Sequence, residues 1–161
     1  MKHKLLHASF LAVIFTLFLL SEAPSSQAGH CSLRNTAGEY GFTLTGVVIP
    51  PTGAVPIAAV GRAVLDASGN ISGTESRSVG GGFADETFTG TYSVNADCTG
   101  TTTLQFFESG QLVRTSVLSI VFDNIEREIR MVQKSLQLPT GAFLPAVITA
   151  EARKLFTEDD D

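Results

Sequence analysis

Turn signals recur through residues 38–155 at the spacing expected for short antiparallel strands. Clusters of Gly, Asn, Asp and Ser separate runs that are rich in Thr, Val, Ile and Phe. This regular spacing of turn residues is typical of an all-β sandwich or barrel. Apolar and polar residues alternate within the runs, as where Tyr40, Phe42 and Leu44 share one face of a strand. A period of two predicts strands with one buried and one solvated face, an arrangement found in antiparallel sheets.

The pattern predicts eight strands, over residues 38–49, 56–66, 70–79, 83–94, 100–107, 111–122, 127–136 and 145–155. Eight strands joined by short turns favour an antiparallel up-and-down barrel, because closure removes the exposed edges of a sheet. A β-sandwich is the alternative. The segment 124–138 is ambiguous, because Ile125, Ile129, Val132 and Leu136 recur at helical spacing. We assign it as a strand for consistency with its neighbours.

The first 28 residues have the composition of a secretory signal peptide. Lys2 and Lys4 form a short basic region, residues 8–20 are mostly apolar, and residues 26–28 place small side chains at a cleavage site. The apolar run is shorter than the roughly 20 residues that a bilayer-spanning helix needs. We therefore predict a signal peptide over 1–28, a secreted or periplasmic protein, and no membrane partner after cleavage.

The remaining residues, 29–161, are enough for a single β-barrel-like domain with one core, which ends in an acidic tail at 157–161. Loss of Lys2, Lys4 and Glu22 with the signal peptide leaves 9 basic and 15 acidic residues, a net charge of −6. Nucleic acids and anionic membranes attract proteins with clustered Lys and Arg. The charge therefore argues against nucleic acid as a partner.

Only two cysteines are present, Cys31 and Cys98. Each is the sole partner available to the other, and an exported protein meets an oxidising compartment. A bond between them would close a loop of about 66 residues and stabilise the fold by about 4 kcal/mol on the loop-entropy estimate. The alternative, a reactive thiolate, needs a nearby histidine or cation, whereas Cys98 lies beside Asp97 and threonines. We predict a Cys31–Cys98 disulfide.

Four stretches resemble, in the same order, a family of small secreted bacterial proteins. They are AGEYGFTLTG, AAVGRAVLDASGNISG, TFTGTYSVNADCTGTTTL and VITAEARK. In that family a cysteine precedes a strand of the pattern xGxYGF, and a GTYxVNxDCTG hairpin carries a second cysteine. The resemblance implies an all-β, barrel-like fold and no particular activity. The segment 133–147 is longer than the usual link in that family, so the resemblance does not define the last connection.

Few residues of the predicted mature chain are typical of catalysis. His30 is its only histidine, so Ser-His-Asp and Cys-His mechanisms lack their usual base and a zinc site built on His and Cys is excluded. The sequence has no GxSxG, HExxH, P-loop or dinucleotide-binding motif. We therefore predict no metal and no cofactor, and we favour a protein that is not an enzyme.

Three charged residues are the remaining candidates for catalysis: Glu75, Glu86 and Arg114. Glu75 shares a strand face with Ile71, and Glu86 shares one with Phe88. If these faces point into the barrel, burial would shift the pKa values of the carboxyl groups and mark a functional site. If the Ser and Thr residues between them point inward instead, both carboxylates lie on the surface. Charged side chains near turns are usually solvated, which favours the surface.

Small residues line one face of two predicted strands, at Ala59, Gly61 and Ala63 and at Ala150 and Ala152. They either make room for bulky neighbours or leave a cavity, since an eight-stranded barrel can hold one small ligand. Our first hypothesis is non-enzymatic binding of a small apolar ligand within a calycin-like barrel. The alternatives are a barrel isomerase or cyclase of the allene-oxide-cyclase type, and a structural or surface-interaction protein with a filled core. A cavity of several hundred Å³ would favour the first two.

Overall fold

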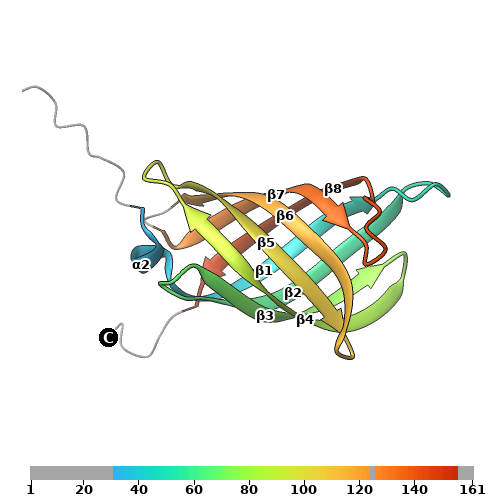
Figure 1. Cartoon of the computed structure of the whole chain (residues 1–161), viewed down its shortest axis with the longest axis horizontal. Coiled ribbons are helices and arrows are strands. Elements are labelled where there is room, and N and C mark those ends of the chain that lie inside the picture. Colours follow the sequence, from blue (N-terminus) through green and yellow to red (C-terminus); the bar gives the residue numbers. More distant parts are fainter. Residues whose placement is uncertain (1–30, 124–125, 156–161) are drawn as a thin grey trace, which may run out of the picture.

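The computed structural model describes residues 31–123 and 126–155, which form a closed antiparallel β-barrel with one short helix at its end (Figure 1). The elements are α2 (Leu33–Thr36), β1 (Gly38–Val48), β2 (Val55–Leu65), β3 (Asn70–Val79), β4 (Gly82–Val94), β5 (Thr99–Glu108), β6 (Gln111–Asp123), β7 (Glu128–Gln137) and β8 (Ala146–Lys154). All eight strands begin and end within one residue of their predicted bounds. The predicted barrel is confirmed, and the sandwich alternative is wrong. The predicted signal peptide, His30 and the acidic tail lie outside the described residues.

Each strand pairs with the next along the chain, and β1 also pairs with β8, which closes the sheet. This up-and-down order gives the barrel two ends. The α2 end carries α2 and the connections β2–β3, β4–β5 and β6–β7 (Figure 1). The hairpin end carries the other four connections, at residues 49–54, 80–81, 109–110 and 138–145.

Residues 128–137 of the ambiguous segment form a strand, as predicted. A β-bulge explains why Ile129 and Leu136 are both buried, whereas Val132, at the helical position between them, is exposed. Along β6, Leu118 pairs with Gln133 while its neighbour Val117 pairs with Ser135, so Lys134 is an extra residue in β7. A bulge changes which positions face inward. Ile129 and Leu136 are therefore both buried although seven residues separate them, a separation that also suits two helical turns.

Two glycines of the sheet, Gly61 and Gly73, make room for aromatic rings inside the barrel. A methyl group added to Gly61 would collide with the ring of Phe42, and one added to Gly73 would collide with the ring of Phe88. The two rings lie edge to face with their centroids 5.9 Å apart, and Phe106 packs on Phe88 at 5.3 Å. Glycine thus allows aromatic side chains to fill the interior at ordinary packing density.

The short helix α2 covers one end of the barrel. Its Ser32 cap accepts a hydrogen bond from the Asn35 backbone N–H, and the Tyr40 hydroxyl donates toward the carbonyl oxygens of Thr36 at 2.7 Å and Glu126 at 3.1 Å. The sequence analysis did not predict this helix, because four residues are too few for a periodic pattern. Within residues 31–123 and 126–155, no helix is long and apolar enough to cross a membrane.

The predicted disulfide is present between Cys31 and Cys98, whose Cα atoms lie 5.0 Å apart. It joins the segment before α2 to the β4–β5 connection. The backbone N–H of Phe122 also donates to the Cys98 carbonyl at 2.9 Å. The disulfide therefore fixes the start of the described chain to the α2 end of the barrel.

Candidate functional site

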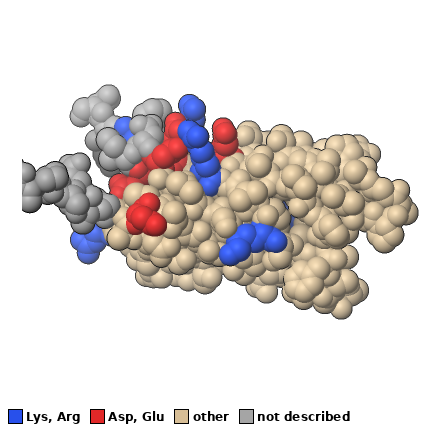
Figure 2. Space-filling view, turned by 90° about the horizontal axis from the view of Figure 1, so that it is seen from above, with Lys and Arg blue, Asp and Glu red and all other residues tan. Residues whose placement is uncertain are grey.

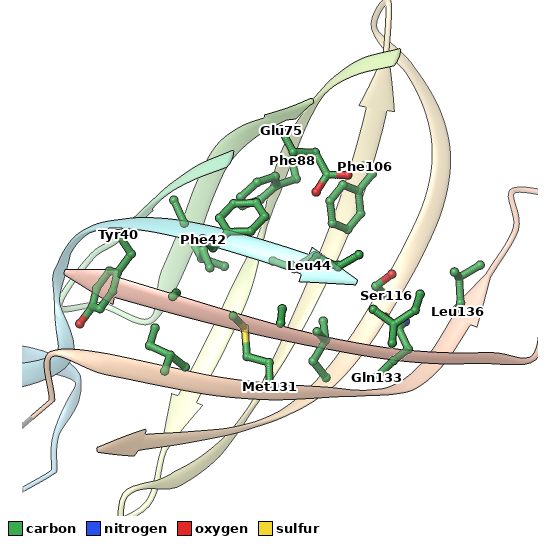
Figure 3. Close-up of a pocket in the computed structure, with 18 of the residues that line it drawn as sticks. Tyr40, Phe42, Leu44, Glu75, Phe88, Phe106, Ser116, Met131, Gln133 and Leu136 are labelled. Atoms are coloured by element: carbon green, nitrogen blue, oxygen red, sulfur yellow. The ribbon is translucent and has the colours of Figure 1, made fainter. Parts of the chain in front are cut away.

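The interior contains a cavity of about 60 Å³ that is lined by side chains from all eight strands (Figure 3). Its walls are mostly aliphatic and aromatic, and they include Phe42, Leu44 and Met131. Five side chains that carry a charge, an amide or a hydroxyl group also line it: Tyr40, Glu75, Arg114, Ser116 and Gln133. The site is thus an apolar chamber with a few polar groups, the usual composition of a small-molecule site.

The cavity is smaller than the several hundred Å³ by which we distinguished a ligand-binding barrel from a filled one. An engineered cavity of about 150 Å³ binds benzene, so about 60 Å³ accommodates only a few atoms without movement of the walls. Larger hollows lie on the outside of the barrel and are open to solvent, including one beside Arg62, Asp85 and Phe107. The interior cavity is therefore the site where an apolar ligand would meet mainly apolar walls.

A cluster of five charged side chains extends from the cavity toward the hairpin end. Arg114 is paired with Glu75, at 2.6 Å between Nη2 and Oε1, and with Glu86 through Nη1. Arg77 is paired with the other oxygen of Glu86 through Nε and with Glu108 at 3.2 Å through Nη2. We call these five residues the carboxylate–arginine cluster. It holds three carboxylates and two guanidinium groups, each of them contacting a neighbour of opposite charge.

Our preference for a surface location of Glu75 and Glu86 was wrong. The two side chains lie directly opposite each other on β3 and β4, and the residues are only 4 % and 3 % exposed. Burying a carboxylate requires a partner that replaces water, and Arg114 and Arg77 supply it. The structure therefore brings the three candidates Glu75, Glu86 and Arg114 together on the interior.

Two members of the cluster, Arg77 and Glu108, were not among the predicted site residues. Arg77 lies two residues after Glu75 on the inner face of β3, and Glu108 lies two residues after Phe106 at the end of β5. The spacing of two was visible in the sequence. The ion pairs of Arg77 with Glu86 and Glu108 could not be seen there, because they depend on which strands lie side by side in the closed sheet.

The carboxyl group of Glu75 has an unusual environment. Burial raises the pKa of Glu75 above its ordinary value, Arg114 opposes this by favouring the charged form, and the adjacent Glu86 carboxylate raises the pKa further. Its Oε1 is bound by Arg114, whereas its Oε2 is buried and has no hydrogen-bond partner among the described residues. A buried oxygen without a partner carries a free-energy cost that a ligand could relieve.

The chemistry open to this site is hydrogen bonding and proton transfer. A buried carboxyl group with a raised pKa and a neighbouring guanidinium group is a common feature of acid–base sites, and it also occurs in structural ion-pair networks. No group of three or more potential metal-ligating side chains occurs within 31–123 and 126–155. A catalytic role for Glu75, Glu86 or Arg114 stays a prediction.

No protein-family model matches the chain, and no curated protein matches it. Two solved structures are similar in fold. One is a redesigned β-barrel, mFAP1, bound to DFHBI, with 14 % identity and a TM-score of 0.50 over 76 % of this chain and 98 % of that one. The other is EF1p2_mFAP2b bound to DFHBI, with 11 % identity and a TM-score of 0.54 over 78 % of this chain and 100 % of that one. These similarities show that the chain shares a β-barrel fold with both structures.

Proposed function

We propose that the barrel binds a small apolar ligand in its interior and does not transform it. The observation that carries this proposal is the mainly apolar interior chamber with a buried, partly unpartnered carboxyl group in its wall. The similarity to two barrels that bind DFHBI supports the same function. A ligand in this chamber would bury most of its surface against apolar side chains, which is the main source of affinity for apolar molecules.

The ligand must be small, or a wall residue must move. Met131 lines the chamber, and methionine side chains are flexible enough to fill or vacate irregular spaces. A rotation of Met131 would enlarge the cavity without a change in the barrel. Phe88, by contrast, packs on both Phe42 and Phe106, and the rings of Phe42 and Phe88 are held opposite Gly61 and Gly73.

Thermal unfolding with and without toluene tests the proposal, because a ligand that binds only the folded state raises Tm. We expect a rise with the wild type and none with Ala150→Leu, since Ala150 lines the cavity and a leucine would fill it. Ala58→Leu is the matched control, because Ala58 is exposed on the outer face of β2. If toluene raises the Tm of Ala150→Leu as much as that of Ala58→Leu, the ligand binds outside the barrel interior. No rise in any of the three proteins would favour the filled-core alternative.

An isomerase or cyclase is the second candidate, favoured by the raised pKa of Glu75 beside Arg114 in the wall of the cavity. A group of this kind can act as a general acid or base on a bound molecule. Turnover of a bound compound that Glu75→Gln abolishes would establish catalysis. Turnover that Glu75→Gln leaves unchanged would remove Glu75 from the reaction.

We also propose that the protein is exported after removal of residues 1–28 and that it is related to the secreted bacterial family described above. The Cys31–Cys98 disulfide supports export, because such bonds persist in oxidising compartments. The mass of the protein purified from its own host tests this. We expect a chain that begins at Gly29, and a chain that retains Met1 through Ala28 would contradict the proposal.

A further inference from the structure

The buried Oε2 atom of Glu75 indicates what kind of polar group a ligand of the barrel carries. Glu75 lies in the wall of the cavity, with its carboxylate beside the ring of Phe106 (Figure 3). The residue is 4 % exposed, and among the described residues its Oε2 has no hydrogen-bond partner. The adjacent Glu86 carboxylate can accept a hydrogen bond from Glu75 only when Glu75 is protonated, so a donor to an ionised Oε2 must come from a molecule in the cavity.

The two guanidinium groups of the cluster are already engaged. Arg114 uses Nη1 and Nη2 for Glu86 and Glu75, and its guanidinium carbon lies 3.7 Å from the centroid of the Phe106 ring. Arg77 is held by Glu86 and Glu108. A ligand carboxylate would have to displace one of these pairs and would meet three carboxylates, so the cluster disfavours an anionic ligand.

A hydroxyl group suits Glu75 in both of its protonation states. When the carboxyl group is ionised, Oε2 accepts a hydrogen bond from the ligand O–H. When it is protonated, a proton on Oε2 can be donated to the oxygen of the same hydroxyl group. The other walls of the cavity are mainly apolar, so the rest of the ligand must be apolar as well.

We propose that the ligand is a neutral, largely apolar molecule with one hydroxyl group, which hydrogen-bonds to Oε2 of Glu75. The inference rests on the proposed function, that the barrel binds a small apolar ligand. It adds a selectivity: the site takes an alcohol or a phenol and rejects a carboxylate of the same size. The apolar chamber supplies the affinity, and Glu75 supplies the specificity.

Toluene, phenol and benzoate are suitable probes, because they share a ring and differ in one substituent. A purely apolar cavity disfavours phenol, since the hydroxyl group loses its hydrogen bonds to water. We expect the wild type to bind phenol at least as tightly as toluene, measured by calorimetric titration, and to bind benzoate most weakly. In Glu75→Leu we expect the preference for phenol over toluene to fall by about tenfold, the effect of one hydrogen bond to a charged or acidic group.

Glu151→Leu is the matched control, because Glu151 is exposed on the outer face of β8 and the same substitution there should leave the phenol preference unchanged. A crystal structure of the wild-type complex with phenol tests the contact even if Glu75→Leu does not fold. We expect the phenol oxygen at hydrogen-bond distance from Glu75 Oε2, and an oxygen placed on Ser116 or Gln133 instead would overturn the inference.

The outcomes separate the inference from the function on which it rests. If toluene binds and phenol binds at least tenfold more weakly, the proposed function stands and the hydroxyl inference fails. If benzoate binds most tightly, the inference fails in the same way. If none of the three probes binds, the proposed function itself fails.

Discussion

The two ends of the barrel are held together by different means. At the α2 end, a disulfide and side-chain hydrogen bonds join α2 and its flanking residues to other parts of the barrel. The disulfide joins the segment before α2 to the β4–β5 connection, the Tyr40 hydroxyl donates toward Thr36 and Glu126, and Lys154 Nζ donates to the Asn35 carbonyl at 3.2 Å. At the hairpin end, backbone hydrogen bonds outside the strands join segments whose strands are adjacent in the sheet. An example is the bond of 2.8 Å from the Ile49 N–H to the Pro145 carbonyl, beside the β1–β8 pair.

The ends also differ in charge. The hairpin end contains four uncharged segments, 44–61, 78–84, 109–113 and 135–150. The carboxylate–arginine cluster adjoins two of these segments, 78–84 and 109–113, and its charges are paired with one another. On the face seen in Figure 2, the charged side chains gather toward the α2 end and the opposite half is uncharged. Because the α2 end is cross-linked and covered, we expect a ligand to enter the barrel through the hairpin end, where local opening breaks fewer contacts.

Loss of the disulfide should have the largest effect on stability. In the double variant Cys31→Ser/Cys98→Ser, we expect the free energy of unfolding to fall by about 4 kcal/mol, because the bond closes a long loop in the unfolded chain. Urea denaturation measures it, and the reduced wild type should lose a similar amount. A loss below about 1 kcal/mol would show that the α2 end does not depend on this link.

The hydroxyl group of Tyr40 tests the same end without a change in covalent structure. Tyr40→Phe keeps the buried ring but leaves the Thr36 carbonyl without its hydrogen bond, and we expect a loss of about 1–3 kcal/mol. Tyr92→Phe, which removes a bond of 2.6 Å to the Asp66 carbonyl, should behave similarly. Urea denaturation in which both variants match the wild type would contradict the role that we assign to these hydroxyl groups.

The interior carboxyl group predicts a dependence of stability on pH. Because folding raises the pKa of Glu75 above its unfolded value of 4.5, its protonated form is favoured in the folded state. Its contribution is fully present below that value and is lost as the pH rises through the folded pKa. The free energy of unfolding of the wild type should therefore fall relative to that of Glu75→Gln as the pH rises above about 4.5.

Asp66 and Asp97 act in the opposite direction and in a lower range. Side-chain hydrogen bonds from Asn70 and Thr99, respectively, lower the pKa values of these carboxyl groups. Their contributions are present above the unfolded value of 3.8 and are lost as the pH falls through the folded pKa values.

Urea denaturation of the wild type and Glu75→Gln between pH 4.5 and neutrality tests the assignment to Glu75. If the difference between their free energies of unfolding stays constant over this range, the assignment is contradicted.

Substitutions at the hairpin end should have the smallest effect. Phe83 and Phe143 are each 69 % exposed, and we expect Phe83→Ser and Phe143→Ser to change the free energy of unfolding by less than about 0.5 kcal/mol. Urea denaturation under the conditions used for Tyr40→Phe gives the comparison. A loss above about 1.5 kcal/mol would show that the hairpin end is packed as firmly as the α2 end.

The strands could be predicted from the sequence because each carries its own evidence, an alternating run between two turn clusters. The disulfide could be predicted because Cys31 and Cys98 have no other partner in the chain. Local pattern and simple counting are enough for features of this kind.

The charged interior could not be predicted in the same way. Whether Glu75 faces inward depends on Arg114, which lies 39 residues further along the chain and on another strand. The burial of Leu136 depends on the bulge at Lys134, which changes which positions of β7 face inward. Both features arise when the sheet closes, and neither has a signal within a single strand.

Binding inside the barrel can be tested most directly at Met131. The chain has two methionines, Met1 and Met131, and after the predicted cleavage a methyl-labelled sample would give one methionine signal. Met131 lines the cavity, so we predict that toluene or phenol shifts its methyl resonance in a saturable way in the wild type and not in Ala150→Leu. A resonance that stays unchanged at saturating concentrations of both compounds would contradict ligand binding in the interior.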